Sequence, residues 1–170
     1  LSAMVRRVLS AVFALITALM IFISDIHDGP DRPDYYEPVR VTSFTLFDTL
    51  LRAQGVTTDG ESFYFSSNYG LIKTELDAVT MTKANSLAIP PKLLMLGCKH
   101  IGGISYYDGK IYAPIEDSKV FNHLYICTYD AQTLKLIGTH KLPLELHENG
   151  VPWCIADPDK GYIYSARRDY

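Results

Sequence analysis

The stretch LGCKHIGGISYYDGKIYAPIED, residues 96–117, contains the pattern that decides the fold. A glycine precedes a short aromatic run, an Asp-Gly turn and a second aromatic run. The same order recurs in RAQGVTTDGESFYFSS, from Arg52, and in HENGVPWCIADPDKGYIYSA, from His147. The glycine before the first run recurs at intervals of 48 and 47 residues, at Gly55, Gly103 and Gly150. Self-similarity at a fixed period of this size indicates a chain built from repeats of one structural unit.

Each repeat is predicted to begin with a β-hairpin. Asp-Gly between two β-prone runs is a strong hairpin signal, because both residues tolerate the positive φ of a tight turn. Turns are therefore expected at Asp59-Gly60, at Asp108-Gly109 and between Asp157 and Gly161. The later halves, LIKTELDAVT and LYICTYDAQTLKLIG, add further strands. A short helix is expected only after the Pro90-Pro91 pair.

About four strands in roughly 48 residues is the pattern of a β-propeller blade. The expected fold class is all-β: a partial β-propeller of about two and a half four-stranded blades after an N-terminal hydrophobic helix. The incomplete propeller covers residues 39–170, with blades that start near residues 52, 100 and 147. A chain of this kind is expected to be a fragment, with apolar sheet faces and edges left exposed.

The blades resemble those of secreted six-bladed propellers of the TolB-like and gluconolactonase-like superfamily. The stretches GGISYYDGKIYAPIED, LYICTYDAQTLKLIG and GVPWCIADPDKGYIY carry the resemblance. It implies the propeller fold, and a scaffold that hosts binding modules, lyases and lactonases alike. In gluconolactonase-like propellers, acids and an Asn hold a divalent cation such as calcium at the channel mouth. The resemblance implies this role for Asn149.

The N-terminus has the layout of a membrane-targeting segment. Arg6 and Arg7 precede sixteen residues, 8–23, in which only Ser10 and Thr17 are polar. Their helical length of about 24 Å is short of a bilayer core of about 30 Å, which favours a cleavable signal peptide. The exit IFISDIHDG lacks a small-x-small cleavage pattern, which favours an uncleaved anchor. A buried core helix is a third interpretation.

Residues 24–38 form an acidic, proline-rich linker that is expected to tether the domain. The basic flank should stay in the cytoplasm, so the rest of the chain is expected outside it, secreted or membrane-anchored through residues 8–23. Of the 170 residues, 48% are hydrophobic and the formal net charge is −3. Without a basic excess to neutralise phosphates, nucleic acid is not expected as a partner.

Polar residues near the predicted channel mouth are the candidate site. Arg52, His100 and His147 share one repeat position, three residues before the glycine. Asn149 lies next to its glycine, and Glu116 and Asp117 are the candidate acids that would join them. Imidazole, guanidinium, amide and carboxylate groups there would bind an anionic small molecule, a protein ligand or a divalent cation. Alternatively, repeated polar residues are structural hydrogen bonders that tie strands together.

The sequence leaves two functions open. The first is a binding or scaffold module of unknown ligand, because no G-x-S-x-G, H-E-x-x-H or phosphate-binding glycine loop is present. The second is a metal-assisted hydrolase or lactonase with its site at the channel mouth. No metal ligand set is assigned. Catalytic residues and cofactor are left unknown.

Overall fold

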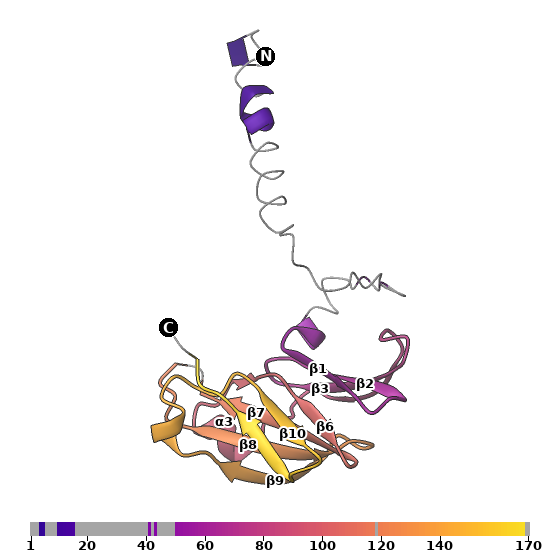
Figure 1. Cartoon of the computed structure of the whole chain (residues 1–170), viewed down its shortest axis with the longest axis vertical. Helices are drawn as coiled ribbons and strands as arrows, with labels where there is room; N and C mark the ends of the chain where they lie inside the picture. Colours follow the sequence, from indigo (N-terminus) through magenta and orange to yellow (C-terminus); the bar gives the residue numbers. More distant parts are fainter. Residues whose placement is uncertain are drawn as a thin grey trace. The chain divides into compact units, whose positions relative to one another are not determined.

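The computed structural model describes residues 4–5, 10–15, 41, 43, 50–117 and 119–168. The chain divides into two compact units, Leu1–Val41 and Thr42–Tyr170. Of the first unit, residues 4–5 and 10–15 are helical and exposed. The second unit consists of three successive antiparallel sheets (Figure 1).

The first sheet is a four-stranded meander in sequence order. Its strands are β1 (Gly55–Thr58), β2 (Ser62–Ser66), β3 (Leu71–Glu75) and β4 (Met81–Asn85). The predicted turn between β1 and β2 is confirmed, with Gly60 at φ 87°. The Asp59 carboxylate accepts hydrogen bonds from two backbone N–H groups and from the Tyr64 hydroxyl, and these contacts fix the turn.

A short helix and a second, five-stranded sheet follow. Helix α3 (Pro91–Met95) begins at a proline, which suits the first helical turn because its missing N–H would have no partner there. The strands of the sheet are β5 (His100–Ile101), β6 (Ser105–Tyr107), β7 (Lys110–Glu116), β8 (Leu124–Asp130) and β9 (Leu136–Lys141). Both β5 and β6 pair with β7. The predicted turn at Asp108-Gly109 is confirmed, with φ values of 47° and 70°.

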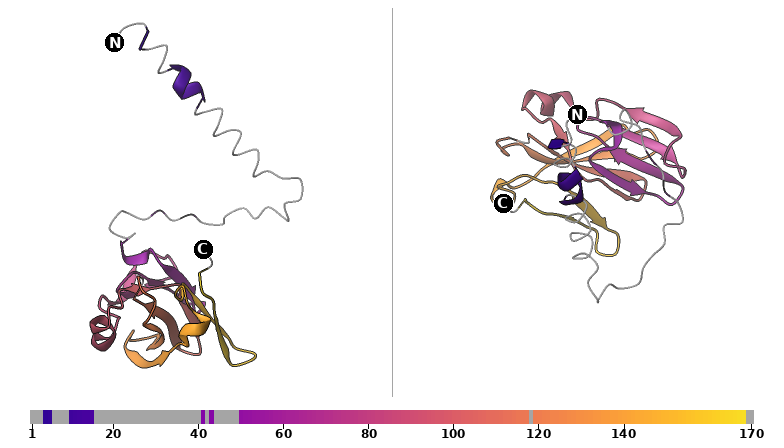
Figure 2. Two further views of the ribbon diagram at one scale, coloured as in Figure 1. Left: turned by 90° about the vertical axis from the view of Figure 1, so that its left-hand side faces the viewer. Right: turned by 90° about the horizontal axis from the view of Figure 1, so that it is seen from above.

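The third sheet is a hairpin. A 3₁₀ turn, η1 (Leu144–Leu146), leads through a loop to β10 (Cys154–Asp157) and β11 (Tyr162–Ser165). Gly161, at φ 67°, lies in the predicted turn between them. Figure 2 shows this hairpin projecting beside the second sheet.

The second sheet is buried on both faces. On one face, Ile111, Ile115 and Tyr129 belong to a core cluster shared with the first sheet and α3. On the other face, Leu124 and Ile126 pack with Val151 and Cys154 of the third segment. Alternating side chains of one strand therefore supply both cores, as the two-residue period of a strand requires.

The first sheet and the third segment both approach the second sheet at Gly103, between β5 and β6. A Cβ placed on Gly55 would lie 2.7 Å from the Cα of Gly103, so a side chain does not fit there. Gly103 in turn forms an isolated parallel bridge with Trp153. Gly150 lies four residues before β10, whereas Gly103 lies two residues before β6. The expected equivalence of Gly103 with Gly150 stays a prediction.

The all-β expectation is confirmed as antiparallel sheets of four, five and two strands. The finer expectation of a propeller stays a prediction. The predicted apolar helix over residues 8–23 is described only at 10–15, and the linker 24–38 lies outside the described residues. Within the described ranges, no helix combines the length and the apolar character needed to cross a membrane.

Candidate functional site

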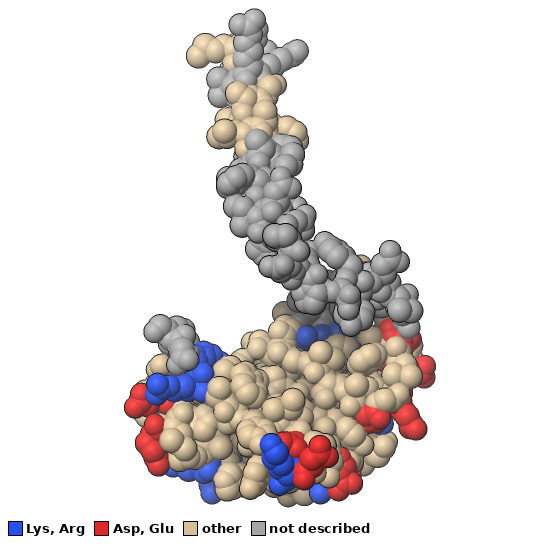
Figure 3. Space-filling model, viewed as in Figure 1, with Lys and Arg blue, Asp and Glu red and all other residues tan. Residues whose placement is uncertain are grey.

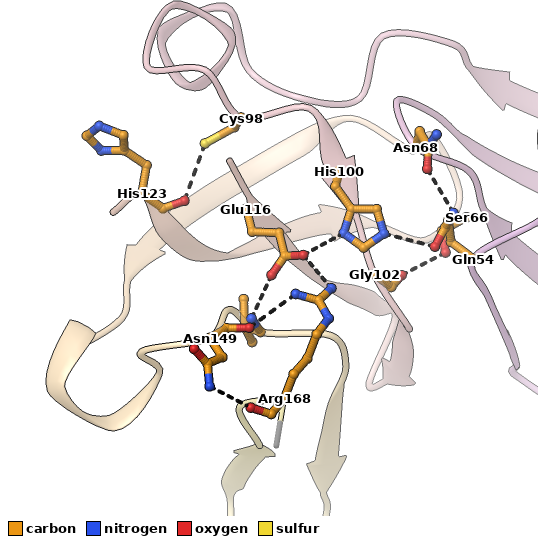
Figure 4. Close-up of polar contacts among 11 residues, drawn as sticks. Gln54, Ser66, Asn68, Cys98, His100, Gly102, Glu116, His123, Asn149 and Arg168 are labelled. Atoms are coloured by element: carbon orange, nitrogen blue, oxygen red, sulfur yellow. Dashed lines mark hydrogen bonds and ion pairs between the residues drawn. The ribbon is translucent and has the colours of Figure 1, made fainter. Parts of the chain in front are cut away.

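Glu116, the last residue of β7, is the centre of a buried polar network (Figure 4). Its side chain is fully buried. One carboxylate oxygen, Oε1, lies 2.9 Å from Nδ1 of His100 and 2.5 Å from Nη2 of Arg168. The other, Oε2, accepts a 2.7 Å hydrogen bond from the Val151 N–H. One carboxylate thus joins the second sheet to the loop before β10 and to the C-terminal segment.

His100 extends this network to the first sheet. Its Nε2 lies 2.9 Å from Oε1 of Gln54, whose amide nitrogen donates to Asn68 at 2.8 Å. The imidazole ring of His100 therefore lies between an oxygen of Gln54, the residue before β1, and an oxygen of Glu116 in the second sheet. Ser66 adds a parallel connection, because its hydroxyl donates to the Gly102 carbonyl at 2.9 Å.

The surroundings of Glu116 determine its charge. Burial alone would raise the pKa of this carboxyl, because it disfavours the charged form. The hydrogen bonds from His100, Arg168 and the Val151 N–H, together with the positive charge of Arg168, outweigh burial and lower the pKa to about 2. Glu116 is therefore a carboxylate at neutral pH, and its hydrogen bonds stabilise that form.

Arg168 is held from its other sides as well. Its Nη1 donates to the Asn149 carbonyl at 3.3 Å, and the Asn149 side chain donates to the Arg168 carbonyl at 3.1 Å. The guanidinium carbon lies 5.5 Å from the ring centre of Phe121, which is close enough for a cation–π contact. Asn149, a predicted site residue, therefore positions Arg168.

The other two residues of the predicted ring lie elsewhere. Arg52 donates to the Ala78 carbonyl at 2.6 Å, at the turn between β3 and β4. His147 is buried, with Nδ1 3.2 Å from the Pro143 carbonyl and Nε2 2.9 Å from the Ser165 hydroxyl. The structure thus brings His100, Glu116 and Asn149 together, but Arg52 and His147 each connect different segments.

Asp117 differs from its neighbour Glu116. The residue is 8% exposed, and its Oδ2 accepts a 3.0 Å hydrogen bond from the Asn122 N–H. Its Oδ1 is buried and has no hydrogen-bond partner in the described structure. Asp117 lines a cavity of about 320 Å³ between the end of α3 and the loop after β7, with Leu96, Gly97, Lys99, Lys119, Val120, Asn122 and His123.

The cysteines are not poised as nucleophiles. Burial raises the pKa of Cys98 to about 11, with the negative charges of Asp117 and Glu116 adding to the effect. Burial likewise raises the pKa of Cys127 and Cys154 to about 12 each. All three are therefore neutral thiols at pH 7, and the thiolate is the reactive form. Among the described residues, no group of three or more His, Cys, Asp or Glu side chains is placed to hold a metal ion.

Sequence reasoning missed Arg168, which supplies the strongest charge contact to Glu116. It lies 52 residues from Glu116, in the segment that follows β11. The sequence feature that could have pointed to it is the Arg167-Arg168 pair. The contact of Gln54 with His100 was missed too, because it depends on how the first two sheets pack.

The comparisons with known proteins add no family. No protein-family model matches the chain, and no curated protein matches it. The resemblance to TolB-like and gluconolactonase-like propellers therefore stays a prediction.

Proposed function

We propose that the protein is a binding module that works outside the cytoplasm, secreted or anchored through residues 8–23, and that its ligand site is the cavity at Asp117. The single observation that carries this proposal is that the buried Oδ1 of Asp117 has no hydrogen-bond partner among the described residues. The apolar N-terminal segment after Arg6 and Arg7 supports the location.

The Glu116 network supports a structural rather than a chemical role for the predicted ring. Both carboxylate oxygens already accept hydrogen bonds, and both nitrogens of His100 face a partner. A group whose bonding capacity is used internally would have to break those bonds to act on a substrate. Such a network stabilises one arrangement of the surrounding segments.

Asp117 has the opposite property. A buried acceptor without a partner costs about 1–3 kcal/mol, and more when the group is charged. A ligand that donates a hydrogen bond to Oδ1 recovers that cost, after a small local shift that exposes the atom. The cavity volume of about 320 Å³ is at the lower end of ordinary ligand pockets, so the ligand is small.

The lining residues define the ligand class. Asp117 requires a cationic or N–H donor. The exposed Lys99 and Lys119 favour an anionic group at the rim, and Leu96 and Val120 offer a small apolar surface. These three features together fit a small zwitterion such as an α-amino acid, with its ammonium group at Asp117 and its carboxylate at the lysines.

Calorimetric titration of the full chain tests the proposal with three probes. L-alanine carries both charged groups, N-acetyl-L-alanine lacks the ammonium and L-alaninamide lacks the carboxylate. We expect L-alanine to bind most tightly, and Asp117→Asn to weaken its binding at least tenfold. The matched control is Asp108→Asn, which changes an exposed carboxylate in a turn. Equal affinities for the three probes, or equal affinities of the two variants, would contradict the proposal.

A further inference from the structure

Phe121 has an uncommon backbone conformation in the connection between β7 and β8. Its φ is 53°, in the left-handed region that residues other than glycine rarely adopt. The last residue pair of the two strands is Glu116 with Leu124, so strand pairing does not hold residues 119–123. A strained residue outside regular structure persists only when its surroundings hold it, and such residues cluster at functional sites. The contacts of Phe121 show what holds it.

The neighbours of Phe121 in the chain line the Asp117 cavity. The wall of the cavity includes the other members of the segment 119–123: Lys119, Val120, Asn122 and His123. The Asn122 N–H donates to Oδ2 of Asp117 at 3.0 Å. The Cys98 thiol donates to the His123 carbonyl at 3.5 Å (Figure 4). The segment 119–123 therefore forms one side of the proposed ligand site.

The ring of Phe121 contacts the buried polar network rather than the cavity. The guanidinium carbon of Arg168 lies 5.5 Å from the ring centre. The ring also packs against the buried cluster that contains Leu124 and Val151. A Cβ placed on Gly150 would lie 2.9 Å from Cδ1 of Phe121, so the glycine leaves the space that the ring needs. Contacts from distant parts of the chain thus hold Phe121 at its positive φ.

Arg168 is a fixed support for this ring. Its guanidinium pairs with the buried carboxylate of Glu116 and donates to the Asn149 carbonyl, and its side chain is 24% exposed. Arg167 pairs instead with the exposed Glu148, and Figure 3 shows basic and acidic side chains together at this end of the described chain. A cation over an aromatic face is attracted more strongly when both are partly removed from water. Arg168 is the arginine that meets this condition.

We propose that Phe121 is a positioning residue for the ligand site at Asp117, a role that rests on the proposed function of that cavity. The ring anchors the segment 119–123 on Arg168, and the segment presents the Asn122 N–H to Oδ2 of Asp117. With Oδ2 bound, the carboxylate keeps one orientation, and Oδ1 is the oxygen that accepts from the ligand. A preformed site of this kind binds more tightly, because the ligand does not have to order it.

Two substitutions separate the ring of Phe121 from its backbone. Phe121→Asn removes the ring but suits the positive φ, because asparagine adopts the left-handed region more readily than most residues. In calorimetric titrations of the full chain, we expect it to weaken the binding of L-alanine about fivefold. Phe121→Tyr keeps the aromatic face and should restore the affinity to within about twofold.

The matched control is Gly109→Val, which strains a turn far from the cavity wall without a clash. This variant should be less stable than the unmodified chain but bind L-alanine as tightly. It therefore distinguishes a loss of positioning from a loss of stability. Equal weakening of binding by Gly109→Val and Phe121→Asn would assign the effect to stability and overturn the positioning role.

Hydrogen exchange of the Asn122 amide, followed by NMR, tests the positioning without a ligand. Asn122 is exposed, so its N–H is protected by the bond to Asp117. We expect exchange about tenfold faster in Phe121→Asn than in Phe121→Tyr or Gly109→Val. An unchanged exchange rate, or L-alanine binding by Phe121→Asn equal to that of the unmodified chain, would overturn the proposal.

Failure of the proposed function gives a different result. An unmodified chain that does not bind L-alanine would contradict the ligand assigned to the cavity, and the exchange rates of Asn122 would then decide the role of Phe121 alone. If Phe121→Asn does not fold, Phe121→Leu replaces it in both measurements. Leucine lacks the aromatic face, and Leu134 already adopts a φ of 55° in this protein.

Discussion

Replacing Glu116 by glutamine tests whether the buried network holds the sheets together. The substitution keeps the shape of the side chain and removes the charge that faces His100 and Arg168. The carboxyl has a folded-state pKa of about 2 against an ordinary value of 4.5. That gap corresponds to about 3 kcal/mol of stability at neutral pH. Removing one partner of a buried pair costs about 3–5 kcal/mol in other proteins, which agrees with this figure.

The sign of the pH dependence follows from the lowered pKa. A carboxyl whose pKa is lower in the folded state contributes its stability above pH 4.5 and loses it as the pH falls toward 2. Urea unfolding, followed by fluorescence of the single tryptophan, should therefore show Glu116→Gln about 3 kcal/mol less stable at pH 7. The difference should shrink steadily between pH 4.5 and pH 2.

The matched control is Glu148→Gln. It removes an exposed carboxylate that forms an ion pair with Arg167, the residue before Arg168. Exposed ion pairs contribute about 0–1 kcal/mol, so this variant should be nearly as stable as the unmodified chain. If the two variants lose the same stability, or if Glu116→Gln keeps the acid dependence of the unmodified chain, the network does not have the role derived for it.

Three further predictions concern the glycines and the N-terminus. Gly109→Val should destabilise by about 1–3 kcal/mol because φ is positive there, whereas Gly138→Val, in open space, should be nearly neutral in the same urea assay. Gly55→Ala should lower the free energy of unfolding by about 1–3 kcal/mol, because its Cβ would lie 2.9 Å from the Ile104 nitrogen. Equal stability of Gly55→Ala and Gly138→Ala would contradict this close approach. Replacing Leu15 and Ile16 by Asp should leave the chain in the soluble cytoplasmic fraction, because inserting each charged side chain into the membrane costs about 2.5–3.5 kcal/mol. Unchanged export of this variant would show that residues 8–23 are not the targeting segment.

The hairpins could be predicted from the sequence because their causes are local. Asp59-Gly60, Asp108-Gly109 and Gly161 all lie in turns between paired strands, and each glycine has the positive φ that the turn requires. The helix after Pro90 was predicted for the same reason. These features depend on neighbouring residues alone.

The third predicted repeat differs locally from the other two. Gly150 has a positive φ of 93° and lies four residues before β10, whereas Gly55 is the first residue of β1 and Gly103 lies two residues before β6. The count from each glycine to its strand therefore varies. The expected equivalence of Arg52, His100 and His147 depended on that count.

The different roles of Glu116 and Asp117 could not be predicted, because the two acids are adjacent in the sequence. Their roles depend on which groups pack around each side chain. Val151 and Arg168 reach Glu116 from distant parts of the chain. Among the described residues, in contrast, the hydrogen-bond partner of Asp117 is the Asn122 N–H on one oxygen. Tertiary packing alone separates a structural acid from a candidate binding group.

Mapping the binding of L-alanine by amide NMR on the full chain tests the central claim most directly. The claim is that the Glu116 network is structural and that the adjacent Asp117 cavity binds the ligand. We predict ligand-dependent shifts of the amide signals of Gly97, Lys99 and Asn122, which line the cavity, without shifts at Gly103 and Trp153. Shifts centred instead on Val151 and Arg168, or no shifts at any of these residues, would contradict the claim.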